Sequence, residues 1–185
     1  MRPAILMLAL AGCSATLQPA EAPAPSRRAT LLFFSDAHAQ LEEHPELFWT
    51  PDGQSEVALA GGYARLAQVA RDIRRQTEGR ALLIDGGDTF QGSGPAAWSE
   101  GEAILAPQRA LGVDLGIPGN WEVVYGPPRM QALVEAVGYP MIAANIVDEA
   151  SGEPIFPATL VREVGGIRIG FVGLDRRRVE VAQAA

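Results

Sequence analysis

The stretch Leu31-Leu-Phe-Phe-Ser-Asp36-Ala-His38-Ala-Gln40 decides how the rest of this chain is interpreted. It is an apolar run that ends at Asp36, and His38 follows two residues later. Because strand side chains repeat every second residue, Asp36 and His38 leave the end of a strand on the same side. A carboxylate and an imidazole held together suit a divalent metal ion. Taken alone, the stretch predicts either the first part of a two-metal site or a buried strand with a polar end.

The composition is that of an ordinary globular protein and, at 185 residues, predicts one folded domain. The net charge is −7 and aromatic residues make up 6% of the chain, which together argue against a surface that binds a nucleic-acid polymer. The single cysteine, Cys13, excludes an internal disulfide. The two histidines are His38 and His44, and we expect His44 to be a surface residue.

The first 28 residues are expected to precede the folded domain. Residues 1–12 have a positive start and an apolar run too short to span a bilayer, as in a signal peptide. Their ending, Leu10-Ala-Gly-Cys13, resembles the lipobox of bacterial lipoproteins, in which the cysteine is lipidated. Residues 13–28 are rich in Pro and Ala and predict an extended tether. We therefore expect an exported lipoprotein, anchored by Cys13 to a membrane and facing the periplasm or cell surface; an ordinary signal peptide is the alternative.

Residues 29–185 show strand patterns that alternate with helix patterns. Strands are predicted at 30–35, 80–85, 113–117 and 140–144, helices at 62–77, 102–111 and 128–137, and a hairpin at 159–173. The alternation predicts an α/β fold with a mostly parallel sheet that is covered on both faces. The polar segment 41–59 is predicted to be a long surface loop, in which Phe48 and Trp49 pack down or, alternatively, line a cleft.

Four polar residues follow predicted strands, where function gathers in such sheets. They are Asp36, His38, Asp88 and Asn120. The carboxylate of Asp88 has enough lone pairs to bridge two metals, and Asn120 offers a neutral oxygen. Each residue alone is also compatible with a turn; together they favour a two-metal site that activates a water molecule.

Three blocks of sequence resemble the calcineurin-like metallophosphoesterases, most closely the branch that contains the 5′-nucleotidases and the Sox thiosulfohydrolase. The blocks are Asp36-Ala-His38, Gly86-Gly-Asp88-Thr-Phe-Gln-Gly-Ser93 and Gly119-Asn-Trp-Glu-Val-Val-Tyr-Gly126. The similarity covers about residues 29–174. It implies a four-layered α/β/β/α sandwich, two divalent ions such as manganese, zinc or iron, and a small phosphate or sulfur substrate, as in nucleotide catabolism. It also implies that Asp36, His38 and Asp88 bind one metal, that Asp88 is shared, and that Asn120 binds the second.

Two departures from the family pattern qualify this expectation. Trp121 stands where the phosphatases carry a histidine, and an indole cannot pass a proton to a leaving group near neutral pH. The histidines that complete both metal shells are also missing, because no histidine follows His44. We therefore expect residues 29–185 to be the N-terminal half of a catalytic domain, with little activity alone. The alternatives are a thiosulfohydrolase-like enzyme, suggested by Trp121, and a non-catalytic binding lipoprotein.

Overall fold

The computed structural model describes residues 27–175. The expected signal peptide, the candidate lipidation site Cys13 and almost all of the expected tether lie outside this range. Among the described residues, no helix has both the length and the apolar character needed to cross a bilayer.

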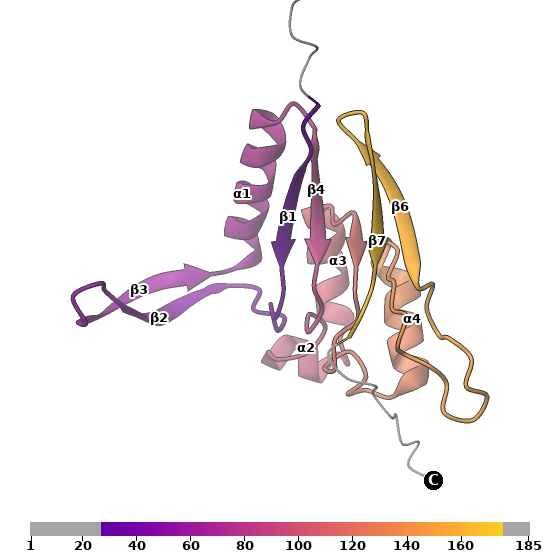
Figure 1. Ribbon diagram of the computed structural model, residues 1–185. Coiled ribbons are helices and arrows are strands. Elements are labelled where there is room, and N and C mark those ends of the chain that lie inside the picture. The colour runs from indigo at the N-terminus through magenta and orange to yellow at the C-terminus, as the bar shows by residue number, and fades with distance from the viewer. Residues whose placement is uncertain (1–26, 176–185) are drawn as a thin grey trace, which may run out of the picture.

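The centre of the fold is a three-stranded parallel sheet in the order β1-β4-β5 (Figure 1). These strands span Thr30–Phe34, Ala81–Asp85 and Leu115–Gly116. The helices α1 (Tyr63–Gln76), α3 (Glu102–Leu111) and α4 (Pro127–Val137) lie on one face of the sheet, and α2 (Gly94–Trp98) lies near the carboxyl ends of the strands. Two antiparallel hairpins complete the fold, β2–β3 (Glu43–Trp49 and Ser55–Gly61) and β6–β7 (Thr159–Val164 and Ile167–Val172).

The main core lies between the sheet and the helices. The apolar residues from which the strands and helices were predicted are buried in it. Every residue of β4 is buried, and Leu83 belongs to the same cluster as Leu105 of α3 and Leu133 of α4. The three predicted helices are confirmed within one residue at each end, and Pro107 lies inside α3 without ending it. The predicted hairpin at 159–173 is also confirmed, since Gly165 and Gly166 form its turn with positive φ values of 59° and 73°.

Two predicted strands are shorter than expected. The segment 113–117 contributes only Leu115–Gly116 to the sheet, and 140–144 makes a single parallel bridge from Met141 to Gly116. The reason is that the backbone groups of residues 140–144 form hydrogen bonds with three different segments instead of with one strand. It bonds to Gly116 at one end, and the amides of Ala143 and Ala144 then bond to Pro157 and Gly173.

The prediction of a surface loop at 41–59 is wrong, because this segment forms the hairpin β2–β3. Its turn is closed by bonds between Thr50 and Gln54, with Gly53 at a φ of 80°. The prediction that Phe48 and Trp49 pack down is also wrong, since both side chains are exposed. The sequence suggested a loop because Pro45 and several acidic residues interrupt the apolar pattern of a buried strand.

The prediction of a sheet covered on both faces is wrong for the described part of the chain. Phe33 of β1 is 64% exposed and Leu31 is also exposed on the face opposite the helices. The β6–β7 hairpin shields only part of that face, where Leu160 and Phe171 pack against a second cluster that includes Ile84. Both faces of β1 are apolar, as the sequence predicted. One face packs against the helices, and the other is exposed to solvent in the described residues.

Candidate metal centre

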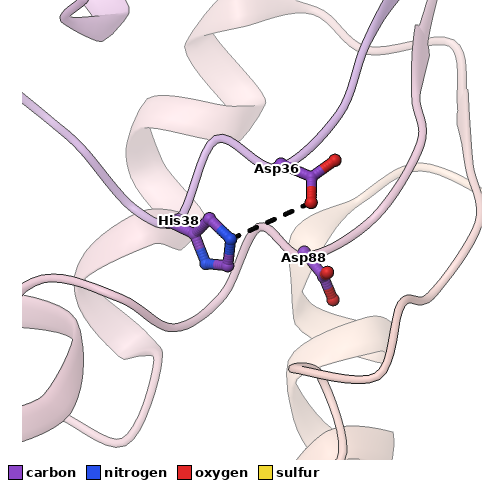
Figure 2. Close-up of side chains that lie close together, drawn as sticks. All are labelled: Asp36, His38 and Asp88. Carbon is purple, nitrogen blue, oxygen red and sulfur yellow. Dashed lines mark ion pairs between the residues drawn. The ribbon is translucent and has the colours of Figure 1, made fainter.

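Two carboxylates and one imidazole that the sequence predicted as ligands lie together at the carboxyl ends of β1 and β4 (Figure 2). They belong to Asp36, Asp88 and His38. Asp36, His38 and Asp88 all have a positive φ, at 55°, 45° and 57°. The two loops that carry them are joined by backbone hydrogen bonds of 2.9 Å, from the amide of Asp36 to Gly87 and from the amide of His38 to Asp88. Such left-handed residues are uncommon outside glycine and cluster at functional sites.

The spacing of the side chains fits a metal ion. One ligand atom from each of Asp36, His38 and Asp88 lies within 4.8 Å of the others. Nε2 of His38 is 3.9 Å from Oδ1 of Asp36 (Figure 2), which is less than two metal–ligand bonds of about 2.1 Å placed end to end. Both groups can therefore bind one ion.

The imidazole of His38 is oriented by a bond on its other nitrogen. Nδ1 lies 3.2 Å from the carbonyl oxygen of Gln91. Because a carbonyl only accepts hydrogen bonds, Nδ1 is the donor of this contact, and Nε2 is the ring nitrogen that faces Asp36. A metal-binding histidine commonly has this arrangement, in which a backbone acceptor fixes the tautomer. The donor set consequently fits a divalent ion in both spacing and orientation.

Asp88 is held by the loop that follows β5. Its Oδ1 accepts a 2.9 Å hydrogen bond from the amide of Trp121. The two loops touch so closely that a Cβ atom at Gly87 would lie 2.5 Å from the amide nitrogen of Gly119. Gly87 also has a φ of 92°, so glycine is required there for two reasons. Asn120 lies in this same turn, between Gly119 and Trp121; its role as a ligand stays a prediction.

Glu122 organises both loops, a role that the sequence analysis did not assign to it. Its side chain is fully buried. Oε2 accepts from the amides of Asp88 and Gly119 at 2.8 and 2.7 Å, and Oε1 accepts from those of Thr89 and Phe90 at 2.5 and 3.0 Å. Burial raises the pKa of the Glu122 carboxyl, while the amide donors lower it. Its position in the third sequence block was the available signal.

A second buried carboxylate, Asp85 at the end of β4, supports the same loop. Its Oδ1 accepts from the amide of Gly87 and the hydroxyl of Thr89, at 3.0 and 2.8 Å. Its Oδ2 accepts from Gln108 and Tyr139, at 3.2 and 2.8 Å. Burial is the main cause that raises the pKa of Asp85, and these hydrogen bonds oppose it. Two buried acidic side chains, Asp85 and Glu122, thus hold the loop that bears Asp88.

An aromatic side chain and a pocket border the cluster. Trp121 packs edge-on against His38, with ring centroids 5.0 Å apart and an angle of 83° between the rings. Asp36 also lines a pocket of about 480 Å³, together with apolar residues such as Phe34 and Leu66 and with Arg65. His44 also lines this pocket, and its Nε2 lies 3.3 Å from Glu46. Among the described residues His44 is not part of the metal-binding group.

The chain is similar to known hydrolases, although no family model matches it. It is 32% identical to a 5′-nucleotidase of Bos taurus, over 92% of this chain and 29% of that protein. In structure it is similar to the sulfate thiohydrolase SoxB of Thermus thermophilus, with a TM-score of 0.73, 26% identity, and coverage of 89% of this chain and 38% of the other. It is also similar to the calcineurin-like phosphoesterase YfkN of Bacillus subtilis, with a TM-score of 0.60, 25% identity, and coverage of 80% and 48%. The chain therefore spans less than a third of the bovine enzyme.

Proposed function

Because this chain is homologous over most of its length to the 5′-nucleotidases, the calcineurin-like phosphoesterases and SoxB, we propose that it is part of an exported, metal-dependent hydrolase that acts on a nucleotide-like phosphate ester. The observation that carries this proposal is the cluster of Asp36, His38 and Asp88, in which Nε2 of His38 faces the carboxylate of Asp36. Asn120, in the turn bonded to Asp88, is proposed as the ligand of a second ion.

In this proposal the residues of this chain hold the metal ions in place and do not transfer protons to the substrate. Two divalent ions, such as manganese, zinc or iron, would supply an activated water at neutral pH and stabilise the charge that develops on the phosphoryl oxygens. Asp36, His38 and Asp88 would hold the first ion, while Glu122 fixes the loop that carries Asp88. Trp121 has no group that protonates a leaving group, so substrates with stable leaving anions are favoured.

Trp121 supports a second candidate function, hydrolysis of a sulfur compound. The indole lies against His38, at the position where the phosphatase pattern has a histidine. The structural similarity to SoxB covers 89% of this chain, which makes a thiosulfohydrolase-like reaction the natural alternative. A binding lipoprotein without catalysis is a third outcome that the experiments below distinguish.

We also propose that these residues form the first layers of a four-layered α/β/β/α sandwich. The open face of the sheet, with Leu31 and Phe33, is an apolar surface on which a second sheet would pack. Within these 185 residues no histidine follows His44, so the chain holds only part of a two-metal shell. We therefore expect the 185-residue chain alone to bind metal weakly and to hydrolyse little.

The decisive experiment compares the two histidines. Manganese and zinc are titrated into the purified chain by calorimetry, and turnover is measured with a nucleoside monophosphate, an aryl phosphate and a thiosulfate conjugate. We expect His38→Gln to weaken metal binding by about tenfold or more, as loss of a ligand does, and His44→Gln to leave it unchanged. Equal metal affinity in the wild type and the His38→Gln variant would rule out the proposed centre.

The proposed location has its own test. Mass spectrometry of the protein from a bacterial membrane fraction is expected to show a lipid on Cys13 and cleavage before it. The Cys13→Ser variant is expected to leave the membrane fraction. A wild-type chain that retains residues 1–12 and carries no lipid would contradict the lipoprotein proposal.

A further inference from the structure

The β2–β3 hairpin projects from the side of the domain and has an apolar face that nothing in the described structure covers (Figure 1). Its cross-strand pairs include Pro45–Leu59, Leu47–Val57 and Trp49–Ser55, which share one face of the ribbon. We call the five residues Pro45, Leu47, Trp49, Val57 and Leu59 the apolar hairpin face. All five side chains are exposed, Trp49 at 73% and Val57 at 69%.

The opposite face of the hairpin is different in character. The pairs His44–Ala60, Glu46–Ala58 and Phe48–Glu56 carry two carboxylates and the imidazole. The hairpin is therefore amphipathic, because its opposite face carries Glu46, Glu56 and His44, although Phe48, Ala58 and Ala60 lie there too. A two-stranded hairpin is marginally stable in water unless its apolar face packs against something. This arrangement indicates that the apolar hairpin face has a partner.

The charges of the hairpin narrow the choice of partner. Residues 43–61 contain four acidic residues, Glu43, Glu46, Asp52 and Glu56, and no Lys or Arg. An anionic membrane or a nucleic acid would be repelled. Asp52 lies in the turn at the tip, and hydrogen bonding from Thr50 lowers its pKa, so it is charged at neutral pH. Insertion of the tip into a neutral bilayer would bury that charge at high cost.

A second copy of this chain fits the hairpin better. Two apolar hairpin faces related by a twofold axis are self-complementary, and Glu46 and Glu56 would point away from the contact on both copies. The only acidic residue on the same face, Glu43 at the root, is already paired with Arg65. The five side chains expose on the order of 500 Å² per copy, so a pair would bury about 1,000 Å², the lower limit for a specific interface.

We propose that the apolar hairpin face is a self-association surface through which two copies of this chain form a weak dimer. Trp49 is its largest contact, since large aromatic side chains dominate such interfaces. The dimer is held by apolar contact between two acidic chains. Added sodium chloride therefore strengthens it by screening their repulsion, the opposite of an ionic interface. This proposal is independent of the proposed hydrolase function.

Sedimentation velocity over a range of protein concentrations tests the proposal on the purified, unlipidated 185-residue chain. We expect a monomer–dimer equilibrium that Trp49→Ser weakens by about tenfold or more. Trp98→Ser is the matched control, because Trp98 is 87% exposed and lies in α2, away from the hairpin. Phe33→Ser tests the open face of the central sheet as a competing contact.

A second measurement keeps the proposal testable if Trp49→Ser misfolds. In a Cys13→Ser background, Leu47→Cys is expected to form a cross-linked dimer under mild oxidation, whereas Ser151→Cys, in the exposed loop before β6, does not. Three results would overturn the proposal. They are a monomer at every concentration, a dimer abolished by Phe33→Ser but not by Trp49→Ser, and Trp49-dependent flotation with phosphatidylcholine vesicles in place of dimer formation.

Discussion

Replacement of Glu122 by glutamine tests the loop architecture of the candidate metal centre most directly. Each oxygen of the buried carboxylate accepts two backbone amides, four in all. The Glu122→Gln change keeps the shape of the side chain but replaces one acceptor oxygen by an NH₂ group. Two backbone amides then face a donor and lose their hydrogen bonds inside the protein.

The size of the effect follows from those two amides. A buried donor left without a partner costs about 1–3 kcal/mol, so two cost about 2–6 kcal/mol. Removing a buried charge offsets part of this cost. We therefore expect Glu122→Gln to lower the free energy of unfolding by about 3 kcal/mol, which corresponds to a fall in Tm of about 6–12 °C for a chain of this size.

Thermal unfolding followed by circular dichroism measures this effect, and calorimetric metal titration measures its consequence at Asp88. The matched control is Glu102→Gln, because Glu102 is an exposed residue whose ion pair with Arg129 contributes under about 1 kcal/mol. We expect metal affinity to fall by about 10-fold or more in Glu122→Gln only. An unchanged Tm would refute the reasoning, because it would mean that the carboxyl is already neutral and does not hold the loops.

Three further predictions address other parts of the structure. Gly87→Ala is expected to destabilise the protein by more than about 2 kcal/mol in chemical denaturation, because its Cβ would meet Gly119. The control Gly53→Ala, also at positive φ but with open space around it, is expected to cost only about 1–2 kcal/mol. Equal costs would contradict the close contact. Burial raises the pKa of Asp85, so the folded state binds the proton of this carboxyl more tightly than the unfolded chain does. The contribution of Asp85 to the free energy of unfolding is therefore largest below about pH 4 and falls as the pH rises through the raised pKa. Asp85→Asn should flatten that dependence in a series of unfolding curves, and an unaltered pH profile would show that Asp85 titrates normally. Phe33→Ser should reduce binding of a hydrophobic dye and raise solubility, because Phe33 lies on the open sheet face; unchanged dye binding would mean that this face is covered in solution.

Much of the fold and part of the candidate site were accessible to sequence reasoning because their signals are local. The helix α1 follows from apolar residues at helical spacing, and the β6–β7 turn follows from Gly165-Gly166. The grouping of Asp36, His38 and Asp88 was predictable because residues that follow parallel strands must meet at one edge of the sheet. By contrast, the segment 41–59 was misjudged, because an exposed amphipathic hairpin lacks the continuous apolar run of a buried strand.

The sequence by itself determined the three long helices, the strands β1 and β4, the β6–β7 hairpin and which side chains can bind a metal. Only the tertiary structure decided that His38 presents Nε2, that Glu122 joins two loops, and that one face of β1 stays open in the described residues. The physical reason is that secondary structure and side-chain chemistry depend on neighbours along the chain. Burial, tautomer and hydrogen-bond partners depend instead on segments that are distant in sequence and meet only when the chain folds.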